Sequence, residues 1–179
     1  KKIANISLPE VQWLIVPRHP NRFDEVARLL QDAGLRVARR SAWQGDVPVA
    51  ADVWLGDSMG EMAAYYTLAD VVLLGGSFAP LGGQNLIEAA ACGCPVVVGP
   101  HTFNFAEATE LACEAGAAWR TPGLPAAADK ALALVQHPYD LEKARAAATA
   151  FAQAHRGAAR ATARQVADLL GVAASSAKD

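Results

Sequence analysis

The sequence lacks the features that mark membrane spans and nucleic-acid partners. No apolar run reaches the roughly 18 to 20 residues that a membrane-spanning helix needs, and no cleavable signal pattern opens the chain. The formal net charge is only −2 over 179 residues, which gives no electrostatic reason to expect nucleic acid or an anionic membrane as a partner. With 19% charged and 53% hydrophobic residues, the composition excludes disorder and favours one packed soluble domain.

Cysteine is also scarce. The chain has three cysteines, Cys92, Cys94 and Cys113, and all lie in Ala- and Gly-rich surroundings. A metal site needs further ligands at suitable spacing, and no second Cys or His pair accompanies them. We therefore interpret the cysteines as small buried hydrophobic residues in a reducing compartment, and we expect neither a metal nor a cofactor.

Two common nucleotide-binding signatures are missing as well. The first predicted strand is followed by Pro17-Arg18-His19-Pro20 and not by Gly-x-Gly-x-x-Gly, so the loop is not of the nicotinamide type. The pattern Gly-x-x-x-x-Gly-Lys-Ser/Thr occurs nowhere, which argues against an ATPase of the P-loop kind.

What the chain does contain is a regular alternation of strand-like and helical patterns, typical of a parallel α/β sheet. The predicted strands are 11–16, 35–38, 53–55, 71–74, 95–98 and 117–120, and the predicted helices between them are 23–33, 61–68, 85–92 and 105–115. After a linker at 121–125 the chain is Ala-rich and helical, with breaks expected near His137-Pro138 and at Gly157. The sequence predicts one Rossmann-like, doubly wound parallel α/β domain with C-terminal helices.

Polar and glycine-rich segments follow four of the predicted strands. They are residues 17–20, 56–62, 75–88 and 99–105. In open parallel sheets, ligands bind beyond the carboxyl ends of the strands. We therefore expect the four loops to surround one crevice at one edge of the sheet.

The segment from Gly82 to Glu88 is the most informative of these. Two glycines directly before a helix let a ligand approach the backbone, and the first helical N–H groups favour an anion such as phosphate. Glu88, one turn into the helix, could accept hydrogen bonds from two ribose hydroxyls. A plain turn and an ordinary first-turn carboxylate explain the same residues, so both readings stay open on this segment alone.

Several charged residues allow a functional and a structural interpretation. Arg18, at the mouth of the first strand, suits a phosphate or carboxylate, although a surface arginine paired with an acid is the alternative. Asp57 and Glu61 resemble a carboxylate pair for acid–base chemistry, but an N-terminal helix cap explains them equally well. His19 and His101 give only weak signals.

Five motifs, taken together and in order, resemble the Kdo transferases, the bacterial 3-deoxy-D-manno-octulosonic acid transferases of lipid A biosynthesis. They are PRHPNRF at 17–23, GDSMGEM at 56–62, GGS at 75–77, GGQN at 82–85 and GPHTFNF at 99–105. The resemblance extends to about Gly116 and is weak in the Ala-rich helices beyond. Family members commonly have His in place of Gln84 and Thr in place of Ser58, and both changes keep a hydrogen-bonding side chain.

The resemblance implies a GT-B architecture, in which two Rossmann-like domains face each other across a cleft and this chain is the donor domain. It implies CMP-Kdo as donor, a lipid A precursor as acceptor, and transfer that inverts the anomeric centre without a metal. Retaining GT-B enzymes often have a second Glu eight positions before the ribose-binding one; here that position is Pro80, in line with inversion. The general base, and the attachment to the cytoplasmic face of the inner membrane, are implied on a missing N-terminal half.

The chain is accordingly expected to be a soluble fragment that binds the donor and is catalytically incomplete. It begins with Lys1 and not with Met, so residues 1–10 are interpreted as a linker from the missing domain. Residues 11–172 are the expected C-terminal nucleotide-sugar-binding domain, and residues 173–179 a frayed tail.

The resemblance also implies the site residues. They are Pro17, Arg18, Met59, Gly60, Glu61, Ser77, Gly82, Gly83, Gln84, Asn85 and Glu88, and none in this chain is implied as catalytic. Arg18 would hold the donor's negative groups, and residues 59–61 would line the nucleotide pocket. Ser77 and the backbone of 82–85 would hold the phosphate, and Glu88 the ribose.

Two alternatives remain. The first is another GT-B sugar-nucleotide enzyme, a transferase or an epimerase, which should prefer a uridine nucleotide. The second is a non-catalytic Rossmann-like module that binds a nucleotide or a partner protein, because fold alone does not decide function.

Overall fold

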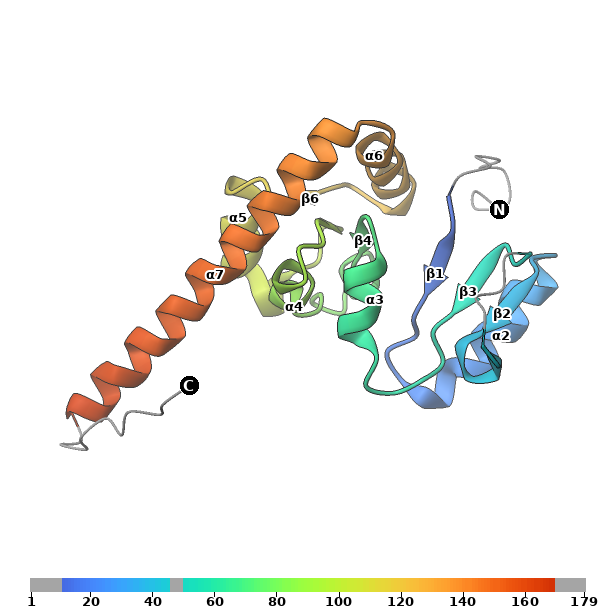
Figure 1. Ribbon diagram of the computed structural model, residues 1–179, viewed down its shortest axis with the longest axis horizontal. Helices are drawn as coiled ribbons and strands as arrows, with labels where there is room; N and C mark the ends of the chain where they lie inside the picture. The colour runs from blue at the N-terminus through green and yellow to red at the C-terminus, as the bar shows by residue number, and fades with distance from the viewer. Residues whose placement is uncertain (1–10, 46–49, 170–179) are drawn as a thin grey trace. The chain divides into compact units, whose positions relative to one another are not determined.

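The computed structural model describes residues 11–45 and 50–169, except the side chains of 156–164 and 166–169. Figure 1 labels most of the helices and strands. The elements are β1 (Trp13–Ile15), η1 (Pro20–Arg22), α2 (Phe23–Asp32), β2 (Val37–Arg39), η2 (Arg40–Ala42), β3 (Val53–Leu55), α3 (Met62–Leu68), β4 (Val72–Leu73), η3 (Gly75–Ser77), α4 (Leu86–Ala91), β5 (Val96–Val98), η4 (Phe103–Phe105), α5 (Ala106–Glu114), β6 (Ala118–Arg120), α6 (Leu124–Gln136) and α7 (Pro138–Leu169). The expected linker 1–10 and tail 173–179 lie outside the described residues.

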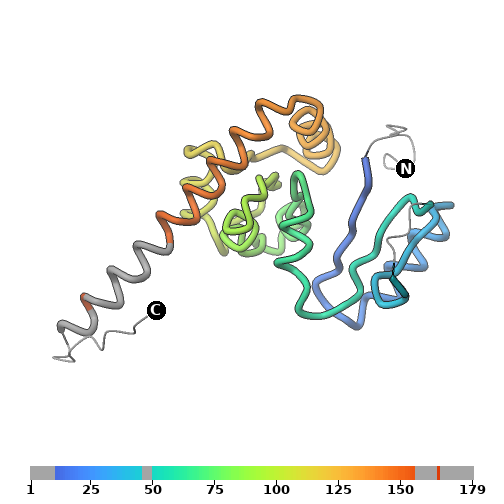
Figure 2. The backbone as a smooth tube through the Cα atoms, viewed as in Figure 1, coloured from blue at the N-terminus to red at the C-terminus, as the bar shows by residue number. Residues whose placement is uncertain are grey.

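The chain divides into two compact units, unit 1 (residues 1–62) and unit 2 (residues 63–179). In unit 1, three parallel strands form a sheet in the order β1-β3-β2, and α2 connects β1 to β2, a path that Figure 2 traces. The central strand β3 has the most buried side chains of the sheet, with Val53 and Leu55 fully covered. Helix α2 ends at Asp32, and Gly34 terminates it with a φ of +82° while the amides of Gly34 and Leu35 donate back to Gln31 O and Leu30 O.

Unit 2 holds a second parallel sheet in the order β4-β5-β6, with α4 and α5 as the crossover connections. Strand β5, in the middle, is buried at every position because helices cover both faces of such a sheet. Helix α7 packs along α4 (Figure 1) through small residues, among them Ala89, Ala90, Ala148 and Ala152 of the hydrophobic core. The high alanine content thus permits close helix packing at the centre of unit 2.

The predicted alternation of parallel strands and helices is confirmed, and element boundaries shift by one or two residues. The strands pair as two sheets of three, one in each unit. The break at His137-Pro138 is confirmed, but the one expected at Gly157 is wrong, because α7 continues to Leu169. A single Gly costs about 1 kcal/mol against Ala in a helix, which neighbouring good helix formers can offset.

Candidate functional site

In unit 2, the loops after β4 and β5 are joined through Ser77. Its buried hydroxyl donates to Leu74 O (2.6 Å) and accepts from Gly99 N (2.7 Å), while its carbonyl accepts from His101 N (3.0 Å). The Ser77 side chain therefore orders the two loops. Its implied contact with a phosphate stays a prediction.

Glycine is required at position 99 because the junction leaves no room for a side chain. A Cβ at Gly99 would collide with the carbonyl oxygen of Ser77 and would lie 2.7 Å from Cδ1 of Phe78. Because backbone cannot move aside as a flexible side chain does, any larger residue would push the two loops apart.

The predicted phosphate loop at Gly82-Gly83 is held by the loop that follows β5. Both glycines have positive φ, +83° and +81°, a region that favours glycine. The amide of Asn104 donates to Gly82 O (3.1 Å), and its Nδ2 donates to Leu81 O (3.3 Å). Gly83 N donates to Gly76 O (3.2 Å), so the loop is tied at both ends.

The start of α4 combines a side-chain cap with unused amides. Asn85 accepts a hydrogen bond from Ile87 N (3.1 Å) through its side-chain oxygen, and its Nδ2 donates to Glu88 Oε1 (3.1 Å). Within the described residues, the backbone amides of Gln84 and Asn85 have no hydrogen-bond acceptor. The exposed Glu88 carboxylate thus lies one helical turn from two backbone amides that could donate hydrogen bonds to an anion.

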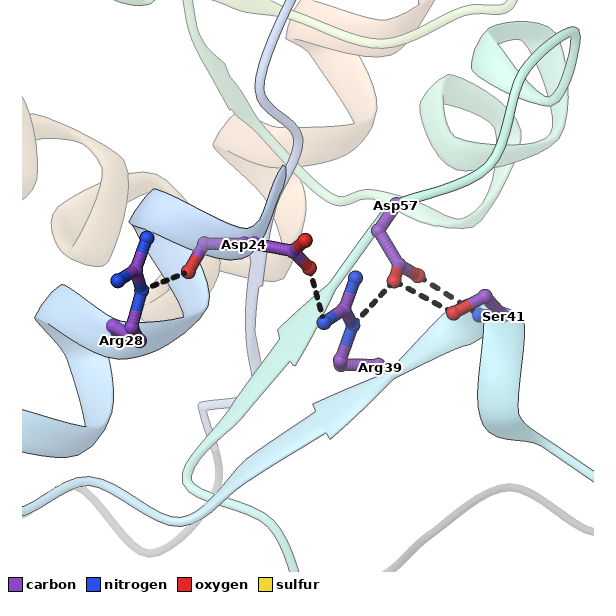
Figure 3. A network of polar contacts seen from close by, with 5 residues as sticks. All are labelled: Asp24, Arg28, Arg39, Ser41 and Asp57. Carbon is purple, nitrogen blue, oxygen red and sulfur yellow. Dashed lines mark hydrogen bonds and ion pairs between the residues drawn. The ribbon is translucent and has the colours of Figure 1, made fainter. Parts of the chain in front are cut away.

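In unit 1, Asp57 is held by a polar network that Figure 3 shows. Its fully buried carboxylate accepts from Arg39 Nε (2.6 Å), Ser41 Oγ (2.6 Å) and Ser41 N (2.8 Å), and Arg39 also pairs with Asp24 (2.6 Å). Burial raises the pKa of Asp57, but the hydrogen bonds from Ser41 and Arg39 outweigh it and leave the pKa below its ordinary value. Asp57 therefore serves as a structural anion, and nothing here supports acid–base work by it.

The neighbouring residues of the 56–62 loop differ from Asp57 in exposure. Glu61 pairs with Arg40 (2.8 Å), and its other oxygen accepts a hydrogen bond from Ser58. Met59 is 71% exposed, and Gly60 has a φ of +81°. An exposed methionine beside a left-handed glycine leaves an apolar surface at the loop tip.

The loop after β1 carries the first two predicted site residues. Pro17 is half-buried and Arg18 is exposed. Within the described residues, the Arg18 side chain makes no hydrogen bond or ion pair, in contrast to Arg39 and Arg40. The Arg18 guanidinium is therefore available to an anion. The alternative interpretation, a surface arginine paired with a nearby acid, is not what the structure shows.

The structure adds a residue that the sequence interpretation missed. Arg120, at the end of β6, donates to Gly99 O (3.3 Å) and Thr102 Oγ1 (2.9 Å) and pairs with Glu110. Together with His101 and neighbouring residues, these side chains line a cavity of about 360 Å³. Its position in the sequence could have identified it, because Arg120 is the last residue of a predicted strand and therefore lies at the edge of the sheet where the loops follow the strands.

The predicted site residues thus fall into two groups. Unit 1 holds Pro17, Arg18, Met59, Gly60 and Glu61, and unit 2 holds Ser77, Gly82, Gly83, Gln84, Asn85 and Glu88. The single crevice remains a prediction. Among the side chains that the structure describes, no cluster of three or more His, Cys, Asp and Glu residues is arranged to hold a metal ion. In the same residues, no helix combines the length and apolarity needed to cross a membrane.

Comparison with solved structures defines the class. The crystal structure of the C-terminal CMP-Kdo binding domain of WaaA from Acinetobacter baumannii matches with a TM-score of 0.73 and 36% identity, over 78% of this chain and 72% of that one. The match, together with parallel sheets and glycine-rich loops after their strands, makes the chain a Rossmann-like half of a GT-B glycosyltransferase fold.

Sequence comparison gives the family. The 3-deoxy-D-manno-octulosonic acid transferase of Bordetella pertussis is 54% identical over 163 residues, which cover 91% of this chain and 38% of that protein. That of Haemophilus influenzae is 42% identical over 107 residues, 59% of this chain and 25% of that protein. No protein-family model matches. The chain belongs to the Kdo transferase family, and it spans less than half the length of these relatives.

Proposed function

We propose that residues 11–172 form the donor-binding domain of a Kdo transferase and bind CMP-Kdo. The observation that carries the proposal is the match to a solved CMP-Kdo binding domain, at 36% identity and over most of both chains. The free amides at Gln84 and Asn85, which follow two glycines with positive φ, support it independently.

The donor's charged groups are assigned to three features. The amides of Gln84 and Asn85 bind the phosphate, because unpaired N–H groups at the start of a helix favour an anion. Arg18 supplies the cation, and Glu88, steadied by the Asn85 amide group, accepts from the ribose hydroxyls. Residues 59–61 line the nucleotide pocket.

The chemistry follows from these assignments. The amides and Arg18 stabilise the negative charge that develops on CMP as its bond to the sugar breaks. The general base belongs to the other half of the protein, where it removes the acceptor hydroxyl's proton as the sugar's anomeric centre inverts. The acceptor of the whole protein is a lipid A precursor, reached at the cytoplasmic face of the inner membrane. The isolated chain would bind the donor and transfer nothing.

Calorimetric titration of the chain with CMP, with UMP as the control ligand, tests the proposal. We expect CMP to bind more tightly than UMP, and Arg18→Ala or Glu88→Ala to abolish or strongly weaken CMP binding. Arg28→Ala and Glu114→Ala, which change exposed residues outside the proposed site, should leave the affinity unchanged.

Other outcomes point to the alternatives. Preference for UMP would favour a different GT-B enzyme. Tight CMP binding that survives both site substitutions would refute the residue assignment. Absence of CMP binding by the chain, if it persists in the full-length protein, would contradict the proposed function itself.

A further inference from the structure

Arg120 lies at a point where one side chain can fix several backbone segments. It ends β6 and donates through Nη1 to Gly99 O (3.3 Å), at the end of β5, and to Thr102 Oγ1 (2.9 Å), three residues further on. Its Nη2 pairs with Glu110 of α5. The guanidinium therefore ties a strand end, a loop and a helix together within unit 2.

The 99–105 loop that Arg120 holds is the one that holds the glycine loop. Asn104 N donates to Gly82 O (3.1 Å), two residues after Thr102 in the sequence. On the other side, Gly99 N donates to Ser77 Oγ (2.7 Å). Hydrogen bonds, joined by short stretches of backbone, thus connect Arg120 to Ser77 on one side and to Gly82 on the other.

The other hydrogen bonds of the 99–105 loop run to the β4 side, to Ser77, Leu81 and Gly82, whereas Arg120 ties the loop to β6 and α5. Phe103 is 64% exposed and Asn104 is exposed, so apolar burial contributes little to holding the tip of this loop. Thr102, by contrast, is buried, and its hydroxyl accepts the shorter of the two Arg120 bonds. A charge-assisted hydrogen bond to a buried acceptor is among the stronger polar contacts, and Glu110 restricts the rotamers of Arg120 further.

We propose that Arg120 is a positioning residue of the donor site, which acts through Gly99 and Thr102 to hold the Gly82-Gly83 loop in its anion-binding conformation. Arg120 itself need not touch the nucleotide. The inference rests on the proposed function, because it assumes that this loop binds the donor phosphate.

The test compares Arg120→Gln with Arg145→Gln in the 179-residue chain. Arg145 is a matched control, since it forms one ion pair with Asp70 and its side chain is 31% exposed, against 32% for Arg120. Hydrogen exchange of the Gly99, His101 and Asn104 amides reports on the loops without any ligand. We expect Arg120→Gln to speed their exchange by about tenfold, and Arg145→Gln to leave it unchanged.

CMP titration then measures the consequence for the site. Arg120→Gln should weaken CMP binding by about tenfold, the order expected when one charge-assisted hydrogen bond is lost. Thr102→Val should give a similar loss, and the double variant Arg120→Gln/Thr102→Val little more than either alone, because both act through one contact. Glu110→Gln keeps the Arg120 donors and should have a smaller effect, which provides a milder variant if Arg120→Gln does not fold.

Each result decides a definite point. Unchanged loop exchange in Arg120→Gln, or CMP affinities that match Arg145→Gln, would overturn the positioning role, and fully additive losses would overturn the route through Thr102. If the unsubstituted chain binds no CMP while Arg120→Gln still frees the loop amides, the positioning of the loop stands and the proposed function fails.

Discussion

The two units order their loops by different means. In unit 1 the loop after β3 depends on charge, because Asp57 is held by Arg39 and Ser41 and Glu61 by Arg40. In unit 2 the loops after β4 and β5 depend chiefly on close backbone contacts, with Arg120 as one charged anchor. Glycines at 82, 83 and 99 allow close approach, and the Ser77 hydroxyl joins the strands that precede the loops.

The difference bears on how each unit could bind an anion. The cations of unit 1 beside Asp57 and Glu61 are already neutralised, so Arg18 is the cation there that the described structure leaves unpaired near the predicted site. Unit 2 offers backbone amides, which carry no counter-charge to displace. Each unit therefore offers an anion a different kind of group, an unpaired guanidinium in unit 1 and unpaired backbone amides in unit 2.

The largest effect should come from filling the backbone junction of unit 2. Gly99→Ala places a methyl group against the Ser77 carbonyl and the Phe78 ring, and neither can withdraw without opening the loops. We expect a loss of about 3 kcal/mol in the free energy of unfolding, measured by urea denaturation.

Gly75→Ala is the matched control, because a Cβ at Gly75 meets no atom within 4 Å and its φ is not positive. Its stability should stay close to that of the unsubstituted chain. Equal losses for Gly75→Ala and Gly99→Ala would show that the loop tolerates any glycine replacement poorly, and that close approach at Gly99 is not the reason.

Removing the buried charge of unit 1 should have the next largest effect. Asp57→Asn keeps the size of the side chain but leaves Arg39 without its buried partner and turns one acceptor into a donor facing Ser41. The loss should be about 2 kcal/mol, measured by urea denaturation at pH 7. A variant as stable as the original chain would show that the network contributes little beyond specificity.

The contrast between the units also shows how far the sequence alone could lead. The hydrophobic pattern and the positions of the glycines predicted every strand and the termination of α2 by Gly34, because these features depend on residues close together in the sequence. The glycine-rich loops were located for the same reason. The partners of Asp57 were not predictable, because Arg39 and Ser41 are remote in sequence and become neighbours only when β2 pairs with β3.

Arg120 was missed for a related reason. Its contacts with Gly99 and Thr102 span about twenty residues and depend on the register of β5 against β6, which no motif encodes. Conversely, the Gly157 break was predicted from propensity alone, and the propensity of one residue is small against that of the long Ala-rich segment around it.

A smaller effect is expected at the cap of α4. Asn85→Ala removes the acceptor of Ile87 N and the donor to Glu88, and should cost about 1 kcal/mol, the usual value of an N-cap. Asn85→Asp keeps an acceptor for the amide and should restore most of the stability by the same denaturation assay. Asn85→Asp should nevertheless weaken CMP binding, although it restores stability, because the new carboxylate repels both Glu88 and the phosphate.

The smallest effect concerns an exposed ion pair of unit 1, Arg36 with Asp52. Hydrogen bonds from the Arg36 side chain and backbone lower the pKa of Asp52 to about 2. Because this folded-state value lies below the ordinary value of 3.8, the pair stabilises the folded state above about pH 4. That contribution is lost as the pH falls from about 4 to about 2.

Asp52→Asn should therefore lower the melting temperature slightly at pH 7, since solvent screens such pairs. The difference from the unsubstituted chain should shrink as the pH falls towards 2, because a carboxyl group with a pKa of about 2 is half protonated there. Asp57→Asn should also lose part of its larger difference from the unsubstituted chain on acidification, because the folded-state pKa of Asp57 likewise lies below its ordinary value. A stability difference between Asp57→Asn and the original chain that stays independent of pH throughout the acid range would mean that packing at this buried position, and not its charge, orders the loop of unit 1.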